Sequence, residues 1–277
     1  MTQRWPVYLS RSLVYLLLIL GSVVMLLPLA WMTSSAFKPL YEVMLIPPTW
    51  IPREPTLDNF RAVFQQFPFA RYILNSVIVA TIVVISTLVT SAMAGYALAK
   101  FDFPGRDFLF IAILSSLMIP FQVRMIPLYQ MIVAFRWVDT LQAVMFPWLV
   151  DAFGIFMMRQ FFLTIPGELL DAARTDGASE LRIFWQIVLP LTRPALSALA
   201  IFTFLGNWEE FLWPLIVSSS HATRTLPVGL QAFSEQYGTN THWQMAGALI
   251  ATLPVLLLFF VLQKQFVEGI TLTGMKG

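Results

Sequence analysis

The sequence predicts an all-α integral membrane protein with six transmembrane helices. Of its 277 residues, 58% are hydrophobic and 12% are charged, whereas soluble domains carry roughly 25% charged residues. Side chains that face lipid need no charge, so this composition suits a membrane protein and not a soluble domain of the same length. Long apolar runs that do not alternate with polar residues, such as 16–20 and 255–260, favour helices over the strands of a membrane barrel.

Six apolar stretches are each long enough to cross a bilayer, which takes about 20 residues in a helix. The first stretch exceeds the apolar region of a signal peptide, so we expect it to remain as an uncleaved helix. The expected spans are residues 13–37, 72–99, 108–125, 138–158, 195–217 and 243–263.

The lysines and arginines in the connections indicate the orientation of these spans. With the N-terminus inside, ten of them lie on the inner side and seven on the outer side. The bias is clearest in the short turn 100–106, which carries Lys100 and Arg106. We therefore expect both termini in the cytoplasm and one transmembrane domain over residues 1–277, with no soluble domain.

Composition and motifs also exclude several kinds of site. The chain has no cysteine and only two histidines, His221 and His242, which excludes disulfides and argues against a histidine-based metal site. It has no basic run that could neutralise the phosphates of a nucleic acid. It also lacks the glycine-rich loop ending in Gly-Lys-Ser/Thr, so we expect no bound ATP or other cofactor in this chain.

The inner connection between the fourth and fifth spans carries the strongest pattern. We predict a short helix, a break and a second helix. Glu168 and Asp171 are expected in the first turn, where negative charge suits the helix dipole. Gly177 suits a left-handed residue after the helix end, and Ser179 suits the N-cap of the second helix. Pro190 and Pro194 are expected to bend the chain as it enters the membrane.

The first of these short helices has an unusually thin surface. It carries small residues that another protein could approach closely; these are Ala172, Ala173, Gly177 and Ala178. Composition alone would favour the alternative, an ordinary amphipathic helix that lies in the membrane interface.

The spacing favours the first interpretation. Asp171-Ala172-Ala173 is followed by three residues, Gly177, nine residues, Ile187, one residue and Leu189-Pro190. This pattern resembles the "EAA" loop of ATP-binding-cassette importer permeases. Residues 95–106, 201–215 and 267–277 also resemble this family, in particular the six-helix permeases of maltose-type carbohydrate importers.

The resemblance implies the type I importer permease fold, with a core over residues 71–263 and a cytoplasmic coupling loop over residues 166–190. A separate ATPase dimer would bind ATP and magnesium, a second homologous permease would complete the pore, and an extracytoplasmic solute-binding protein would deliver the solute at the bacterial inner membrane. The implied ATPase-coupling residues are Glu168, Asp171, Ala172, Ala173, Asp176, Gly177, Ala178, Ile187, Leu189 and Pro190. Asp171 departs from the family, which usually has glutamate there.

A few polar residues at membrane depth are candidates for the translocation path, because a charge there is costly unless it is paired or wet. Acids and an aromatic ring could hydrogen-bond and stack on a sugar; the alternative is that they pair with a neighbouring helix or with the second permease. Glu209 stands where the family often has asparagine. The candidates are Asp151, Asn207, Trp208, Glu209 and Glu210.

The outer connection 218–242 is long, and long ordered loops are often functional. In maltose-type importers the matching loop enters the sugar site of the binding protein. The resemblance therefore implies a contact through Leu226, Pro227, Val228, Gly229, Leu230 and Gln231. The alternative is a plain connector between two helices.

The resulting prediction is a non-catalytic permease subunit of an ATP-driven importer for a sugar, an oligosaccharide or a polyol-type solute. A secondary transporter or channel is one alternative, but such proteins tend to contain repeats and the sequence shows none. A membrane enzyme of the glycosyltransferase type is the other. It would need convergent catalytic groups, whereas the acids here are dispersed.

Overall fold

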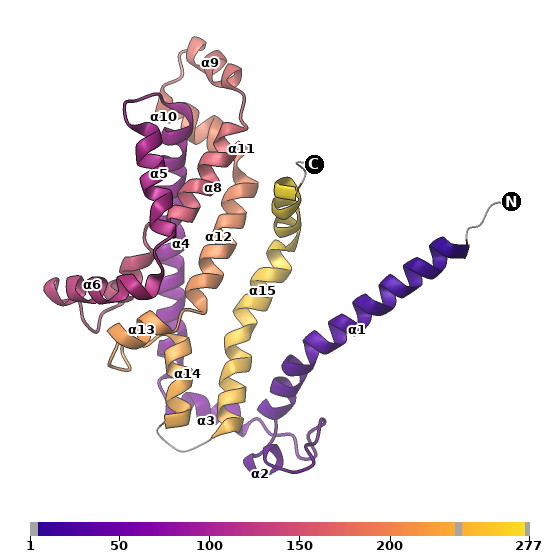
Figure 1. Ribbon diagram of the computed structural model, residues 1–277. Helices are drawn as coiled ribbons and strands as arrows, with labels where there is room; N and C mark the ends of the chain where they lie inside the picture. Colours follow the sequence, from indigo (N-terminus) through magenta and orange to yellow (C-terminus); the bar gives the residue numbers. More distant parts are fainter. Residues whose placement is uncertain (1–4, 236–239, 275–277) are drawn as a thin grey trace. The chain divides into compact units, whose positions relative to one another are not determined.

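The computed structural model describes residues 5–235 and 240–274, and within them the side chains of 11–231, 233 and 240–261. Over this part of the chain every regular element is helical (Figure 1). The elements are α1 (Trp5–Ala36), α2 (Leu40–Val43), α3 (Asp58–Gln66), α4 (Phe69–Lys100), α5 (Arg106–Leu117), α6 (Phe121–Ala134), α7 (Leu141–Met145), the 3₁₀ turn η1 (Phe146–Trp148), α8 (Ala152–Leu163), α9 (Gly167–Thr175), α10 (Glu180–Ile183), the π-helical turn η2 (Phe184–Val188), α11 (Leu189–Leu191), α12 (Arg193–Trp208), α13 (Leu212–Val217), α14 (Leu226–Glu235) and α15 (Thr241–Gly274).

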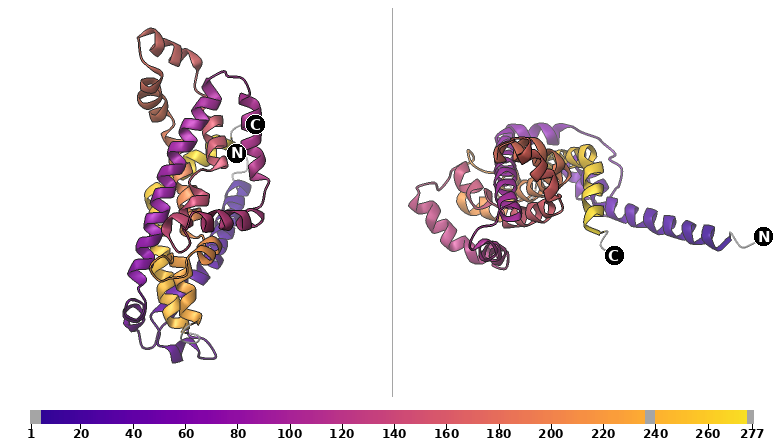
Figure 2. Two further views of the ribbon diagram at one scale, coloured as in Figure 1. Left: turned by 90° about the vertical axis from the view of Figure 1, so that its left-hand side faces the viewer. Right: turned by 90° about the horizontal axis from the view of Figure 1, so that it is seen from above.

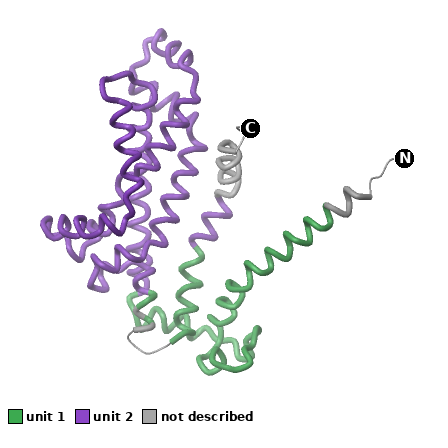
Figure 3. Tube along the Cα trace, in the orientation of Figure 1, with its two compact units in different colours: residues 1–68, 230–253 green, residues 69–229, 254–277 purple. Residues whose placement is uncertain are grey.

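The chain divides into two compact units (Figure 3). Unit 1 contains residues 1–68 and 230–253, and unit 2 contains residues 69–229 and 254–277. The coupling-loop residues, the path candidates and residues 226–229 of the predicted contact segment lie in unit 2, whereas Leu230 and Gln231 of that segment lie in unit 1.

In unit 1, polar side chains order the proline-rich segment that follows α1. Asn59 of α3 donates from Nδ2 to the carbonyl oxygens of Ala36 and Lys38, both at 2.8 Å, and so satisfies the end of α1. Glu42 accepts hydrogen bonds from the Arg53 backbone (2.8 Å) and the Thr49 hydroxyl (3.0 Å). The segment is therefore held by its own polar groups and leads into α3.

In unit 2, α4 packs against α8 and α12, and the three helices lie side by side in Figures 1 and 2. Gly95 permits the close approach of α4 to α8, because a Cβ atom there would lie 2.9 Å from both Met158 Cβ and the Arg159 nitrogen. The core between them is apolar and aromatic at its α9 end. Its buried members are Ala92, Tyr96, Met158, Phe162, Ile165, Leu170, Ala173, Ile183, Phe184, Val188, Ala195 and Leu199.

Three helices of the described chain are single segments long and apolar enough to cross a membrane: Arg11–Ala36, Phe69–Lys100 and Thr241–Val261. Three further pairs reach that length only together, across bends of 100° (α5 and α6), 42° (α7–η1 and α8) and 76° (α10–α11 and α12). The total is six if each bent pair counts as one span.

The bends correct the boundaries of three expected spans. The stretch 108–125 is not one helix, because α5 ends at Leu117 and Pro120 precedes α6. The stretch 138–158 is interrupted before α8, and the stretch 195–217 is interrupted between Trp208 and Leu212. The expected bend at Pro190 and Pro194 is confirmed, because α11 and α12 meet there at 76°.

Candidate functional site

The coupling loop has the predicted order of helix, turn and helix, at one end of unit 2 (Figure 1). Gly177 has a φ of +80°, a backbone conformation that favours glycine. The Ser179 hydroxyl caps α10 by accepting from the Arg182 nitrogen at 3.4 Å. Both features follow the expectation from the sequence. Asp171 does not: it is the fifth residue of α9, not a residue of its first turn, where only Glu168 stands as an acid.

Helix α9 turns one face inward and the other outward. Leu170 and Ala173 are buried and join the core of unit 2. Leu169, Ala172 and Thr175 are exposed. The thin surface predicted for a partner is therefore carried by Ala172, whereas Ala173 packs within the chain.

The remaining coupling candidates divide between the turn and the entry to the membrane. The Asp176 nitrogen donates to the Ala172 carbonyl and the Ala178 nitrogen to the Ala173 carbonyl, each at 3.0 Å, which closes the end of α9. Ile187 and Leu189 are half-buried and pack against the core of unit 2. Pro190 is exposed at the bend.

Arg174 joins the two sides of this turn, and we did not anticipate it from the sequence. Its Nη1 donates to Asp171 Oδ1 at 2.7 Å on the same helix, and its Nε donates to Glu180 Oε1 at 2.6 Å on α10. These hydrogen bonds raise the pKa of Arg174 further above its usual value, so the guanidinium stays charged. Asp171, three residues before Arg174 on the same helix, was the available signal.

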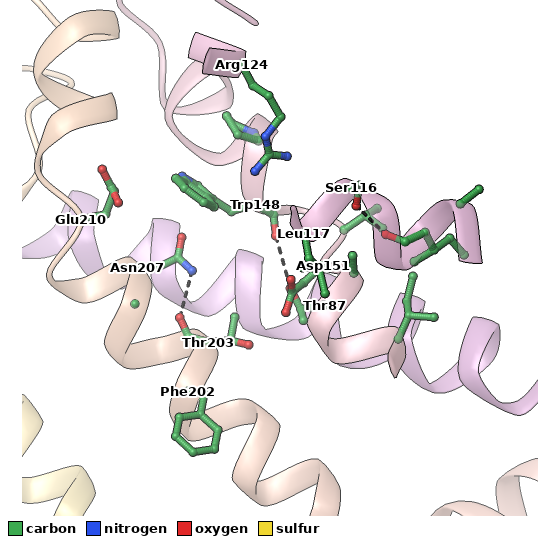
Figure 4. A pocket seen from close by; sticks show the side chains of 17 residues that line it. Thr87, Ser116, Leu117, Arg124, Trp148, Asp151, Phe202, Thr203, Asn207 and Glu210 are labelled. Carbon is green, nitrogen blue, oxygen red and sulfur yellow. Dashed lines mark hydrogen bonds between the residues drawn. The ribbon is translucent and has the colours of Figure 1, made fainter. Parts of the chain in front are cut away.

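A cavity of about 650 Å³ opens in unit 2 between the broken helices (Figure 4), a volume within the usual range of small-molecule sites. Three of the five path candidates line it: Asp151, Asn207 and Glu210. Trp208 does not, because it is only 3% exposed and stacks on Phe204 with ring centroids 5.4 Å apart. Glu209 is exposed at the C-cap of α12 and is also outside the lining.

The polar groups that line this cavity also hydrogen-bond to the backbone of the helices around it. Asp151 is the N-cap of α8 and accepts from the Phe153 and Gly154 nitrogens at 3.1 and 3.0 Å. Glu210 accepts from the Trp213 nitrogen at 3.1 Å, and Asn207 donates to the Thr203 carbonyl at 2.9 Å. The acids therefore stand at the starts of broken helices, where the helix dipole stabilises negative charge.

Several lining residues were not predicted. Arg124 of α6 points toward the cavity and Trp148 lies beside it (Figure 4). The Trp148 ring packs on Phe121 with centroids 4.6 Å apart. Hydroxyl groups come from Thr87, Ser116 and Thr203. Among the residues that the structure describes, no cluster of three or more acids and histidines could hold a metal ion. Hydroxyls, an amide, carboxylates and an indole ring can hydrogen-bond and stack on a polyhydroxyl solute.

The connection before α14 is held by hydrogen bonds to α4 and to the turn between α6 and α7. Asp139, at φ 60°, accepts from the backbone nitrogens of Ser219 (2.9 Å) and Ser220 (3.0 Å) and from the Thr223 hydroxyl. Burial would raise the pKa of Asp139, but these donors outweigh it and hold the pKa well below its usual range. Asn75 of α4 donates to the carbonyl oxygens of Ala222 and Arg224, both at 2.9 Å.

The segment predicted to contact a binding protein opens a helix, α14, and does not form a loop tip. Leu226, Val228 and Gly229 are buried, whereas Pro227, Leu230 and Gln231 are half-buried. A Cβ atom on Gly229 would lie 2.2 Å from the Tyr72 ring, so the two are in direct contact. Among the side chains of this connection that the structure describes, the exposed ones lie earlier, at Ser219, His221 and Ala222.

Comparison with known proteins gives the family. Residues 91–271 match the family described as "Binding-protein-dependent transport system inner membrane component". The chain is 41% identical over 253 residues to the arabinooligosaccharides transport system permease protein AraQ of Halalkalibacterium halodurans, covering 90% of this chain and 91% of the relative. It is 32% identical over 282 residues to the sn-glycerol-3-phosphate transport system permease protein UgpE of Brucella abortus, covering 99% of each.

A solved structure shares the fold. A chain of a bacterial ABC transporter involved in the import of the acidic polysaccharide alginate superposes with a TM-score of 0.84 at 21% identity, covering 96% of this chain and 99% of that one. The family that the coupling-loop pattern predicted is confirmed. The chain therefore belongs to the binding-protein-dependent transport system inner membrane components, the non-catalytic permease subunits of ATP-binding-cassette importers.

Proposed function

We propose that this permease imports an oligosaccharide or a related polyhydroxyl solute through the cavity of unit 2, driven by ATP hydrolysis on separate ATPase subunits. The observation that carries the proposal is the lining of that cavity, where Asn207 and Glu210 lie beside hydroxyl groups and the Trp148 ring. The relatives support the solute class, since one is an arabinooligosaccharides transport system permease and another is an sn-glycerol-3-phosphate transport system permease.

The coupling helix supports the proposed ATPase partner. Its outward face carries Ala172 beside Leu169 and Thr175, so a groove on another protein can approach it closely. A dimeric ATPase has two such grooves and this chain carries one coupling loop. A second, homologous permease is therefore proposed as the other half of the pore.

The proposal is tested in the whole importer, reconstituted in liposomes with its binding protein. We expect arabino-oligosaccharides or malto-oligosaccharides to stimulate ATPase activity and to accumulate inside. Asn207→Ala should lower transport, because the amide lines the cavity, whereas the neighbouring Glu209→Ala should not, because Glu209 is outside the lining. Solute transport driven by an ion gradient without ATP would contradict the proposal, and so would equal transport by the two variants.

Orientation is a separate prediction. We propose that both termini are cytoplasmic, with α9 inside and the connection 218–225 outside. The chain has no native cysteine, and Thr175 and Ser219 are both exposed. Thr175→Cys should react with a membrane-impermeant maleimide only from the cytoplasmic side, and Ser219→Cys only from the outer side. Labelling of both from one side would rule out this topology.

A further inference from the structure

The turn between α9 and α10 is a weak point in the coupling loop unless something braces it. Gly177, at φ +80°, has no side chain to pack, and no atom lies within 4 Å of the place of a Cβ. Glycine has more conformational freedom than any other residue. A force applied to α9 could therefore be absorbed by rotation at this turn before it reached the bundle.

Apolar packing alone fixes α9 loosely. Only Leu170 and Ala173 of this nine-residue helix are buried, and burial of apolar surface is non-directional. Two buried residues on one face therefore give α9 few directional restraints on rotation about its own axis.

Arg174 supplies directional hydrogen bonds on both sides of this turn. Its guanidinium reaches across the turn to Glu180 at 2.6 Å while it holds Asp171 at 2.7 Å. A planar guanidinium that donates to two carboxylates fixes the geometry on both sides, which a lysine ammonium does not.

Glu180 links Arg174 to the membrane helices of unit 2. Its Oε2 accepts from the Tyr96 hydroxyl at 3.4 Å. Tyr96 is a buried residue of α4, and its ring packs on Phe162 of α8 at 5.7 Å and Phe184 of η2 at 5.2 Å between centroids. Arg174, Glu180 and Tyr96 thus form a continuous path from α9 to α4, α8 and the π-helical turn η2.

We propose that Arg174 is a positioning residue that braces α9 against α10 and, through Glu180 and Tyr96, against α4, so that displacement of α9 moves the membrane helices instead of bending the turn at Gly177. The proposal rests on the proposed coupling of α9 to an ATPase. It assigns to Arg174 no contact with ATP or with the solute.

The first test measures solute transported per ATP hydrolysed in the reconstituted importer. Arg174→Gln should lower this ratio roughly threefold to fivefold, the effect expected from loss of two partly exposed, charge-assisted hydrogen bonds. Arg182→Gln is the matched control, because Arg182 donates only along its own helical segment, to Gln186 at 2.9 Å, and it should leave the ratio unchanged. Equal ratios for Arg174→Gln and the wild type would overturn the proposal.

A double-mutant cycle distinguishes loss of the Arg174–Glu180 interaction from a general loss of stability. Glu180→Gln should lower the ratio as Arg174→Gln does, and the double variant should be no worse than either single one. Arg174→Lys should recover only part of the ratio, because lysine keeps the positive charge but lacks the planar guanidinium that can donate to two carboxylates at once. Additive losses would overturn the proposal.

The last readout does not depend on transport. A spin label on Thr175→Cys, measured in the detergent-solubilised subunit without the ATPase because Thr175 lies on the proposed docking face, should become more mobile with Arg174→Gln and not with Arg182→Gln. An importer without ATP-driven transport in the wild type would overturn the proposed function, and label mobility would still test the brace. Unchanged mobility with Arg174→Gln would overturn the brace whatever the transport activity.

Discussion

Replacing Ala172 by arginine is expected to leave the chain folded in the membrane and to lower ATP-driven transport at least tenfold. Ala172 is exposed on the outward face of α9, so the new side chain has room in the isolated subunit. If α9 docks in a groove of the ATPase as proposed above, the new side chain would place a bulky, unpaired charge in that interface, which costs about 2–5 kcal/mol. Transport into liposomes and co-purification of the ATPase measure the loss.

The neighbouring position is the matched control. Ala173 is 9% exposed and packs in the core of unit 2. Ala173→Arg should therefore lower the unfolding temperature of the subunit itself, whereas Ala172→Arg should not. Wild-type transport by Ala172→Arg would remove this face of α9 from the coupling mechanism.

The coupling loop shows how far the sequence alone could go. Gly177 and Ser179 were predictable because a positive φ and an N-cap are demands of the local backbone, and residue type reports them directly. The roles of Ala172 and Ala173 were not, because the two residues are chemically identical and only the packing of Leu170 decides which one faces inward. Arg174 was missed because its partner Glu180 lies beyond the turn, whose geometry the pattern does not give.

The membrane spans show a different limit. Hydropathy counts apolar residues, so it found every apolar stretch, but it does not register where a helix stops inside one. The 100° bend between α5 and α6 falls within the apolar stretch 108–125. Pro120 was a visible signal, because proline is incompatible with a continuous helix there.

The same limit affected the candidate path. Asp151 and Glu210 stood out as acids at membrane depth, and both line the cavity. Their hydrogen bonds to the starts of α8 and α13 could not be anticipated while those stretches were taken as unbroken. Arg124 was not predicted to line the cavity, because α6 was not expected to turn back beside Trp148.

The second prediction of large effect concerns Gly229, at which helix propensity and steric clash act in opposite directions. Alanine favours a helix over glycine by about 1 kcal/mol, so Gly229→Ala in α14 would be stabilising if space allowed. Space does not allow it, because the added methyl would lie 2.2 Å from the ring of Tyr72. That ring is fully buried against Phe69, and its hydroxyl is hydrogen-bonded to His221. Overpacking costs typically 1–3 kcal/mol, so the clash prevails.

We therefore expect Gly229→Ala to lower the unfolding temperature of the detergent-solubilised subunit. Gly206→Ala is the control within α12, where no atom lies within 4 Å of the new methyl, and it should leave that temperature unchanged or raise it. An unfolding temperature equal to that of the wild type for Gly229→Ala would mean that α14 does not pack on α4 as described.

The exposed residues of the connection before α14 should behave in the opposite way. Ala222 has an exposed side chain, while its carbonyl oxygen is held by Asn75 at 2.9 Å, so Ala222→Trp should leave the unfolding temperature unchanged. If a solute-binding protein docks on this surface, the added indole should obstruct it and reduce its stimulation of ATPase activity, with basal ATPase activity unaffected because α9 is untouched. Full stimulation with Ala222→Trp, alongside the destabilisation by Gly229→Ala, would show that this connection serves only the packing of unit 2.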